Sequence, residues 1–160
     1  MKSKIAALFL LFAAISINSS DFMKISAEGI SINVPLGWLA EYKKTPVIFM
    51  VYSPEETQNT VRENYNLVIE NLPRAYTLEE YSSLSLKNIK ALFTNIDVVE
   101  QKNNYHIYKA DYNGIKLQQI QYFFIKNKIA YVLTFSSVQD TFEQYKNLFF
   151  EIAKSFEISK

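Results

Sequence analysis

From residue 22 onward, the chain alternates between short apolar runs of strand length and two longer segments with helical periodicity. Apolar and polar positions alternate on both sides of Glu28-Gly29, which predicts a β-hairpin over residues 23–34. Pro35 and Gly37 end its second strand, because proline offers no N–H and glycine permits a tight bend. Further strands are predicted at 47–52, 65–70, near Val98, and at 105–112, 115–125 and 129–135.

Turn-forming residues predict how these strands connect. Asn113-Gly114 favours a two-residue type I′ turn, because both central positions of that turn need positive φ. A second turn is predicted at Lys126-Asn127-Lys128. The polar stretch 53–63 has no periodicity, and we expect it to form a surface loop.

Two capping-box patterns predict the helix starts. Thr77-Leu78-Glu79-Glu80 opens a helix that runs to about Phe93. Asp140-Thr141-Phe142-Glu143 opens the last helix in the same way. Spacing predicts that Leu78, Tyr81, Ile89 and Leu92 point inward from the first helix. The inward positions predicted for the last helix are Phe142, Tyr145, Phe149, Ile152, Ala153 and Phe156.

The order of strands, helix, meander and helix predicts an α+β fold: an antiparallel β-sheet of about six strands sandwiched by helices. Residues Tyr122 to Ile125 are apolar at every position, which predicts that both sheet faces are covered there. No internal repeat or linker divides the chain, so we expect one domain over residues 20–160.

Several short motifs are spread over most of this domain: Pro35-Leu36-Gly37-Trp38, the Asn66 strand, Thr77-Leu78-Glu79-Glu80-Tyr81, the Gly114 turn, Tyr131-Val132-Leu133-Thr134, Phe149, Ile152 and Ser155-Phe156. Together they resemble the PsbP-like superfamily, which includes the Mog-type and DcrB-like proteins. The resemblance implies an antiparallel sheet between helices and no common catalytic residues. Many DcrB-like relatives are lipoproteins, whereas this chain has no cysteine to carry a lipid.

The N-terminus has the pattern of a secretory signal peptide. Lys2 and Lys4 precede an apolar run over 5–15, which is shorter than the roughly 20 residues of a membrane-spanning helix. We expect residues 1–19 to be removed by cleavage near Ser16 or Ser19, which would place the protein in the periplasm or outside the cell. The alternative is an uncleaved segment that anchors the chain in the membrane.

Composition excludes several classes of site. The 160 residues contain no cysteine, one histidine and three glycines, which excludes disulfide scaffolds, zinc–thiolate sites, multi-histidine metal sites and glycine-rich phosphate loops. Loss of Lys2 and Lys4 with the leader lowers the count of basic residues from 17 to 15 against 16 acidic ones, so the net charge changes from +1 to −1. A near-neutral domain lacks the basic surface that nucleic acids require.

Few residues suggest catalysis. His106, the only imidazole in the chain, either takes part in acid–base chemistry or is an ordinary strand residue facing solvent or a layer boundary. The adjacent pairs Glu55-Glu56 and Glu79-Glu80 supply carboxylates, but neighbouring side chains diverge on a helix or strand. We expect no metal site, because Asp97, Asp111 and Asp140 lack calcium-loop spacing. No cofactor is expected.

Aromatic residues offer two further alternatives. Trp38 either lines a pocket or interface, or fastens the bend at 35–38 to the core. Tyrosines recur through the strand region, where an aromatic face would bind an apolar ligand or peptide if open, and form core if covered by a helix. These tyrosines are Tyr105, Tyr108, Tyr112, Tyr122 and Tyr131.

Three functional hypotheses follow. The first is an exported, non-enzymatic accessory protein that acts through contacts with an envelope protein. The sequence specifies neither the identity of that partner nor the residues that contact it. The second is a carrier of a small apolar ligand, which requires a pocket of roughly 300 Å³ or more between sheet and helix. The third is an enzyme, which requires His106 or a carboxylate in a cleft with partners at hydrogen-bond distance.

Overall fold

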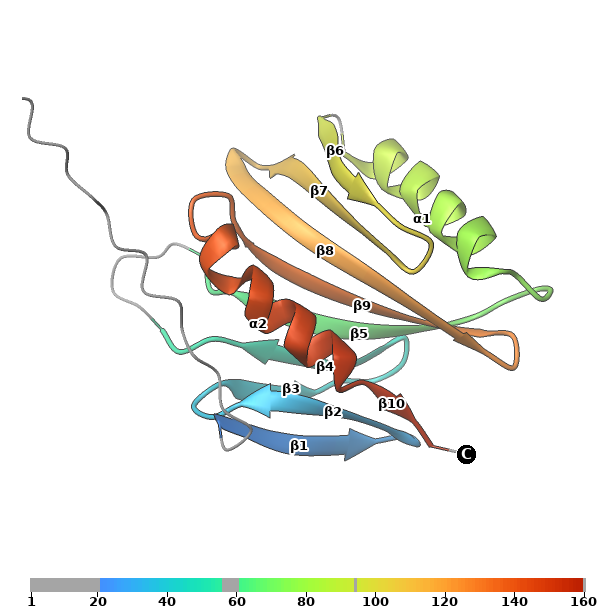
Figure 1. Cartoon of the computed structure of the whole chain (residues 1–160), viewed down its shortest axis with the longest axis horizontal. Coiled ribbons are helices and arrows are strands. Elements are labelled where there is room, and N and C mark those ends of the chain that lie inside the picture. Colours follow the sequence, from blue (N-terminus) through green and yellow to red (C-terminus); the bar gives the residue numbers. More distant parts are fainter. Residues whose placement is uncertain (1–20, 56–60, 94, 160) are drawn as a thin grey trace, which may run out of the picture.

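The computed structural model describes residues 21–55, 61–93 and 95–159, which form ten strands and two helices (Figure 1). The helices are α1 (Leu78–Leu92) and α2 (Phe142–Lys154). The strands are β1 (Phe22–Ala27), β2 (Ile30–Pro35), β3 (Leu39–Tyr42), β4 (Val47–Tyr52), β5 (Asn64–Asn71), β6 (Ile96–Gln101), β7 (Tyr105–Tyr112), β8 (Ile115–Lys126), β9 (Ile129–Val138) and β10 (Glu157–Ile158).

The strands form two antiparallel sheets. The larger has seven strands in the order β3-β4-β5-β9-β8-β7-β6, and the smaller has three in the order β1-β2-β10. The predicted α+β fold with an antiparallel sheet between helices is therefore confirmed, and the sheet is larger than the predicted six or so strands. The N-terminal hairpin forms a sheet of its own, and the short strands β3 and β10 carry too few residues to show a periodic pattern.

Residues in the left-handed region make the predicted turns. Glu28 and Gly29 have φ values of 49° and 75° between β1 and β2, and Asn113 and Gly114 have 53° and 83° between β7 and β8. Asn127 and Lys128 also have positive φ between β8 and β9. The predicted hairpins are confirmed, and the last two join β7, β8 and β9 into a continuous meander.

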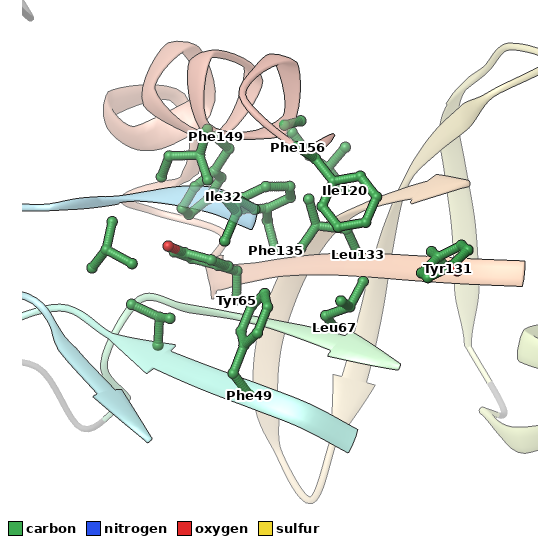
Figure 2. Packing of buried hydrophobic residues seen from close by; sticks show 14 of the residues in the cluster. Ile32, Phe49, Tyr65, Leu67, Ile120, Tyr131, Leu133, Phe135, Phe149 and Phe156 are labelled. Carbon is green, nitrogen blue, oxygen red and sulfur yellow. The ribbon is translucent and has the colours of Figure 1, made fainter. Parts of the chain in front are cut away.

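The main core lies between the seven-stranded sheet, α2 and the small sheet (Figure 2). Phe149 of α2 contacts Phe135 of β9, with ring centroids 5.1 Å apart. Ile32 brings the small sheet into the same cluster, and the hydroxyl of buried Tyr65 donates to the Asn33 carbonyl oxygen across 2.9 Å. The predicted inward face of the last helix is confirmed, since its apolar residues belong to or pack against this core.

The opposite face of the large sheet is covered by α1. Tyr81 of α1 packs edge-on against Phe123 of β8, with ring centroids 5.5 Å apart. On the other face of β8, Phe124 contacts Phe156 at 4.5 Å. The helices thus cover opposite faces of the sheet, and the prediction that residues 122–125 are covered on both sides is confirmed.

Helix α1 begins as predicted and faces the sheet with a partly different stripe. Both hydrogen bonds of the Thr77–Glu80 capping box are present. Tyr81 and Ile89 are buried, as predicted, whereas Leu78 and Leu92 are 36% and 79% exposed. The prediction is wrong for these two leucines because they lie in the first and last turns, while Ser82 and Leu86 occupy inward positions of the middle turns.

Helix α2 begins without the predicted capping box. Its N-cap, Thr141, makes no side-chain cap hydrogen bond, and its hydroxyl instead donates to the Glu63 carboxylate across 2.8 Å. Glu63 and Ser53 are both buried, so the prediction of a surface loop over 53–63 is wrong at its two ends. Residues 56–60 lie outside the described part of the chain.

The predicted signal peptide at 1–19, with its cleavage positions Ser16 and Ser19, also lies outside the described residues. Within the described ranges, neither α1 nor α2 has the length and apolar character needed to cross a membrane.

Candidate functional site

A groove runs between α1 and the face of the large sheet formed by β5, β9 and β8. Its volume is about 210 Å³. Three apolar side chains line it, namely Val68, Leu84 and Val132. The other six are polar: Glu70, Tyr81, Ser85, Asn88, Gln121 and Thr134.

Strand register aligns polar side chains in a row that includes Thr134 and Gln121 of this groove and extends beyond it on both sides. Asn66 of β5 pairs with Thr134 of β9, Thr134 pairs with Gln121 of β8, and Gln121 pairs with His106 of β7. The Gln121 amide nitrogen donates to the Thr134 hydroxyl across 3.2 Å. Because neighbouring strands lie about 4.8 Å apart, these residues form one continuous polar row.

Ser85 of α1 joins this row to the helix. Its hydroxyl donates to the side-chain amide oxygen of Gln121, Oε1, across 2.8 Å, and the same oxygen lies 3.1 Å from His106 Nε2. A carbonyl oxygen only accepts, so Nε2 carries the imidazole proton. His106 Nδ1 has no hydrogen-bond partner among the described residues.

His106 is fully buried, with 0% exposure, between the sheet and α1. Its ring packs against Phe123 at 4.9 Å and Tyr108 at 5.5 Å. Burial lowers the pKa of His106 from 6.5 to about 4, and the hydrogen bond to Gln121 opposes this only partly. The solvent-facing alternative is wrong, and the layer-boundary alternative is confirmed.

This environment does not form the acid–base pair that an enzyme would need. The ring of His106 has no exposed surface, and its polar contact is the neutral Gln121 amide. The hydroxyl of Ser85 donates its hydrogen bond to Gln121 and not to His106. A general base must instead lie within hydrogen-bond reach of the proton it removes.

The carboxylates at the groove mouth and on α1 have structural partners. The Tyr81 hydroxyl donates to Glu70, and burial, followed by that carboxylate, raises the pKa of Tyr81. Glu80 accepts from the Thr77 backbone N–H across 2.8 Å and from Arg74 across 3.1 Å, which lowers the pKa of Glu80. Glu79 borders a separate depression with Gln101 and other polar residues.

The predicted carboxylate pairs therefore form no paired site in the described structure. Glu55 lies 3.6 Å from Arg62, and Glu56 is outside the described residues. Among the residues that the structure describes, no group of three or more His, Cys, Asp or Glu side chains could hold a metal ion.

Glu63 is a buried carboxylate that the sequence pattern did not reveal. Its two oxygens accept hydrogen bonds from Thr141 at 2.8 Å and Ser53 at 3.2 Å. Thr141 lies 78 residues away along the chain, so no local motif marks the pair. The network ties the end of β4 and the start of β5 to the N-terminus of α2.

The predicted aromatic candidates belong mainly to the core. Trp38 is half-buried against Tyr65 and Tyr145, with ring centroids 6.2 Å and 6.3 Å away, as expected of a residue that fastens the bend. Tyr108 and Tyr131 are buried. Tyr105 and Tyr122 are partly buried against the main core, which favours the core interpretation for this set except Tyr112.

Tyr112 and Leu92 form an exposed apolar surface at the C-terminal end of α1, which we call the α1-end patch. Leu92 is 79% exposed and Tyr112 is 56% exposed, and Phe93 packs edge-on against Tyr112 at 6.3 Å. They line an open depression of about 690 Å³. Its polar border consists of Asn95, Asp111, Asn113 and Gly114.

The fold is shared with proteins of known structure. No protein-family model matches the chain, and no curated protein matches it. The solution structure of PsbP (CyanoP) from Synechocystis sp. PCC 6803 matches with a TM-score of 0.57 and 14% identity over 92% of this chain and 98% of that one.

Two other structures show the same likeness. The Ran-binding protein Mog1p from Saccharomyces cerevisiae matches with a TM-score of 0.63 and 8% identity over 86% of this chain and 95% of that one. LpqN of Mycobacterium tuberculosis, described as involved in cell envelope biogenesis, matches with a TM-score of 0.57 and 12% identity over 87% of this chain and 91% of that one. At such identities the comparisons show the fold alone, and they confirm the PsbP/Mog-like architecture.

Proposed function

We propose that the protein is an exported, non-enzymatic accessory protein of the cell envelope that acts by binding another envelope protein. The observation that carries this proposal is the α1-end patch. Leu92 and Tyr112 expose large apolar side chains at one depression, which Asn95, Asp111 and Asn113 also line. An apolar centre within a polar rim is the usual anatomy of a protein interface.

Two further observations support the proposal. Residues 1–19 have the cationic and apolar regions of a secretory signal peptide, which favours a periplasmic or secreted location after cleavage near Ser16 or Ser19. Two proteins with this fold are described as Ran-binding and as involved in cell envelope biogenesis. Those descriptions favour a role in recognition rather than in chemistry.

The other hypotheses have less support. A carrier of an apolar ligand needs roughly 300 Å³ or more between sheet and helix. The groove beside α1 has about 210 Å³, and six of its nine lining side chains are polar. An enzyme would need an accessible acid–base group, whereas His106 is enclosed and neutral at physiological pH.

Affinity purification from the envelope fraction of the host tests the proposal. We expect the tagged protein to retain a specific envelope protein, and Leu92→Gln to lose it. The matched control is Leu36→Gln, because Leu36 is 62% exposed but lies in the turn after β2. The proposed surface would be contradicted if both variants retained the envelope protein equally, or if the wild-type protein enriched no envelope protein at any salt concentration.

Export is tested separately by intact-mass spectrometry of the protein from periplasmic and membrane fractions. The expected result is a soluble mature form that begins after Ser16 or Ser19. A full-length mass found only in the membrane fraction would instead show that the N-terminal segment is an anchor.

A further inference from the structure

The groove beside α1 is polar but nearly uncharged. Glu70 is the only charged residue among those that line it, and its carboxylate accepts the Tyr81 hydroxyl. Among the described residues that line the groove there is no lysine or arginine, so these residues offer no counter-charge for a phosphate or an acidic sugar. Its charge and polarity therefore fit a neutral ligand rich in hydrogen-bonding groups.

Several polar groups at the groove have unused hydrogen-bonding capacity. The side chains of Asn66 and Asn88 make no hydrogen bond with the rest of the described chain, and both are at least partly exposed. The Thr134 hydroxyl accepts from Gln121 and keeps its own proton to donate. Each asparagine amide offers two donors and a carbonyl acceptor, a combination that matches pairs of neighbouring hydroxyl groups.

Apolar side chains lie among these polar groups. Leu84 of α1 is 38% exposed at one wall, and Val68 and Val132 lie on the floor. A ligand with both hydroxyl groups and C–H surfaces would satisfy the two kinds of lining together. A sugar ring has this character, since its hydroxyl groups lie around a ring that also presents C–H groups.

A peptide fits this groove less well. Strands β5, β9 and β8 are interior strands of the sheet, so their backbone groups are already paired on both sides and cannot pair with an added strand. A bound amphipathic helix would need a continuous apolar stripe, whereas most of the lining is polar.

We propose that this groove binds one unit of a neutral oligosaccharide, with Asn88 and Thr134 of its lining bonded to the hydroxyl groups of that unit and Asn66, which pairs with Thr134, available to the next unit. The groove shares no lining residue with the α1-end patch. The volume of about 210 Å³ is below that of a pocket that encloses a whole small ligand, so only one unit of the oligosaccharide would occupy the groove.

NMR titration of the isotope-labelled full chain with cellohexaose, maltohexaose and chitohexaose tests this proposal. We expect at least one sugar to shift the amide resonances of the groove residues. Asn88→Ala should weaken that binding about fivefold, the effect of one lost hydrogen bond. Asn147→Ala is the matched control, because Asn147 is also exposed on a helix, α2, and makes no side-chain hydrogen bond in the described chain.

Two results would overturn the proposal. One is the absence of groove shifts with all three sugars at about 10 mM, which is tenfold above a dissociation constant of 1 mM. The other is tighter binding of a short uncharged peptide at the same resonances, which would assign the groove to peptides. Neither Asn88 nor Asn147 lies in the α1-end patch. If the sugar titration fails, the expected recovery of an envelope protein by affinity purification is therefore unaffected.

Discussion

At the scale of single residues, burial rather than a charged neighbour determines how His106 titrates. Its ring lies between Phe123, Tyr108 and α1, and its hydrogen-bond partner is the neutral Gln121 amide. Burial disfavours the charged imidazolium, so the folded protein holds His106 neutral down to a pH of about 4.

This burial predicts acid sensitivity. Between pH 6.5 and about 4, the unfolded chain binds the imidazole proton while the folded chain does not. The stabilising effect of the neutral form is therefore complete above pH 6.5 and is lost as the pH falls toward 4. We expect the free energy of unfolding to fall by on the order of 3 kcal/mol from this group, measured by urea denaturation at several pH values.

His106→Gln provides the control, because glutamine keeps a side-chain donor but has no titrating proton. Exposed carboxylates titrate equally in both proteins, so the difference between the two curves isolates His106. Parallel curves for the variant and the wild-type protein between pH 6.5 and 4 would show that His106 is not held neutral.

The buried carboxylate of Glu63 gives a second prediction. Glu63→Ala removes the nearer acceptor of both Thr141 and Ser53 and leaves each hydroxyl only a backbone carbonyl oxygen at 3.4 Å. We expect the free energy of unfolding to fall by about 2 to 3 kcal/mol, since hydrogen bonds to a charged group are the stronger kind. Glu143→Ala, at an exposed position of α2, should change it by less than about 0.5 kcal/mol. Equal effects of the two substitutions would contradict the assigned role of Glu63.

At the scale of elements, the sequence predicted correctly those turns and helix caps that depend on residues close together in the chain. The turn at Asn113-Gly114 and the capping box at Thr77–Glu80 depend on residues within three positions of one another, and both are present. Helix α2 begins where predicted, but the predicted capping box is absent, and Thr141 bonds instead to Glu63 from a distant part of the sequence. Spacing alone also did not show that Leu92 falls in an exposed last turn.

The two helix starts can be compared by substitution. Thr77→Ala removes a cap hydrogen bond from α1 and should lower the free energy of unfolding by about 1 kcal/mol. Asp140→Ala removes no cap from α2 and should change it by less than about 0.5 kcal/mol. Thermal or urea denaturation of both variants gives the comparison. A loss at Asp140 as large as that at Thr77 would show that α2 has a side-chain cap after all.

At the scale of the whole molecule, the helices cover opposite faces of the large sheet (Figure 1). The class of fold followed from the order of strands and helices, but the two candidate surfaces did not. Asn88 and Thr134 line one groove only because α1 crosses the sheet beside β5 and β9. Leu92 and Tyr112 likewise come together only because the end of α1 lies near the β7–β8 turn. Such long-range placement leaves no pattern in one sequence.

Apolar residues in the core and in the α1-end patch should respond differently to substitution. Phe149 is fully buried, so Phe149→Ala should lower the free energy of unfolding by about 3 to 5 kcal/mol. Leu92→Gln should change it by less than about 0.5 kcal/mol, because Leu92 is 79% exposed. Urea denaturation measures both values. A large loss at Leu92 would show that this residue stabilises the fold instead of facing a partner.

In-cell photocrosslinking tests the central proposal most directly. A photoreactive amino acid would replace Leu92 in one strain and Leu36 in another, and adducts would be compared in the envelope fraction after illumination. The account predicts a discrete adduct with one envelope protein from position 92, which is absent from position 36 and lost when Tyr112→Gln is added. No adduct at position 92, or the same adducts from both positions, would contradict a partner that binds the α1-end patch.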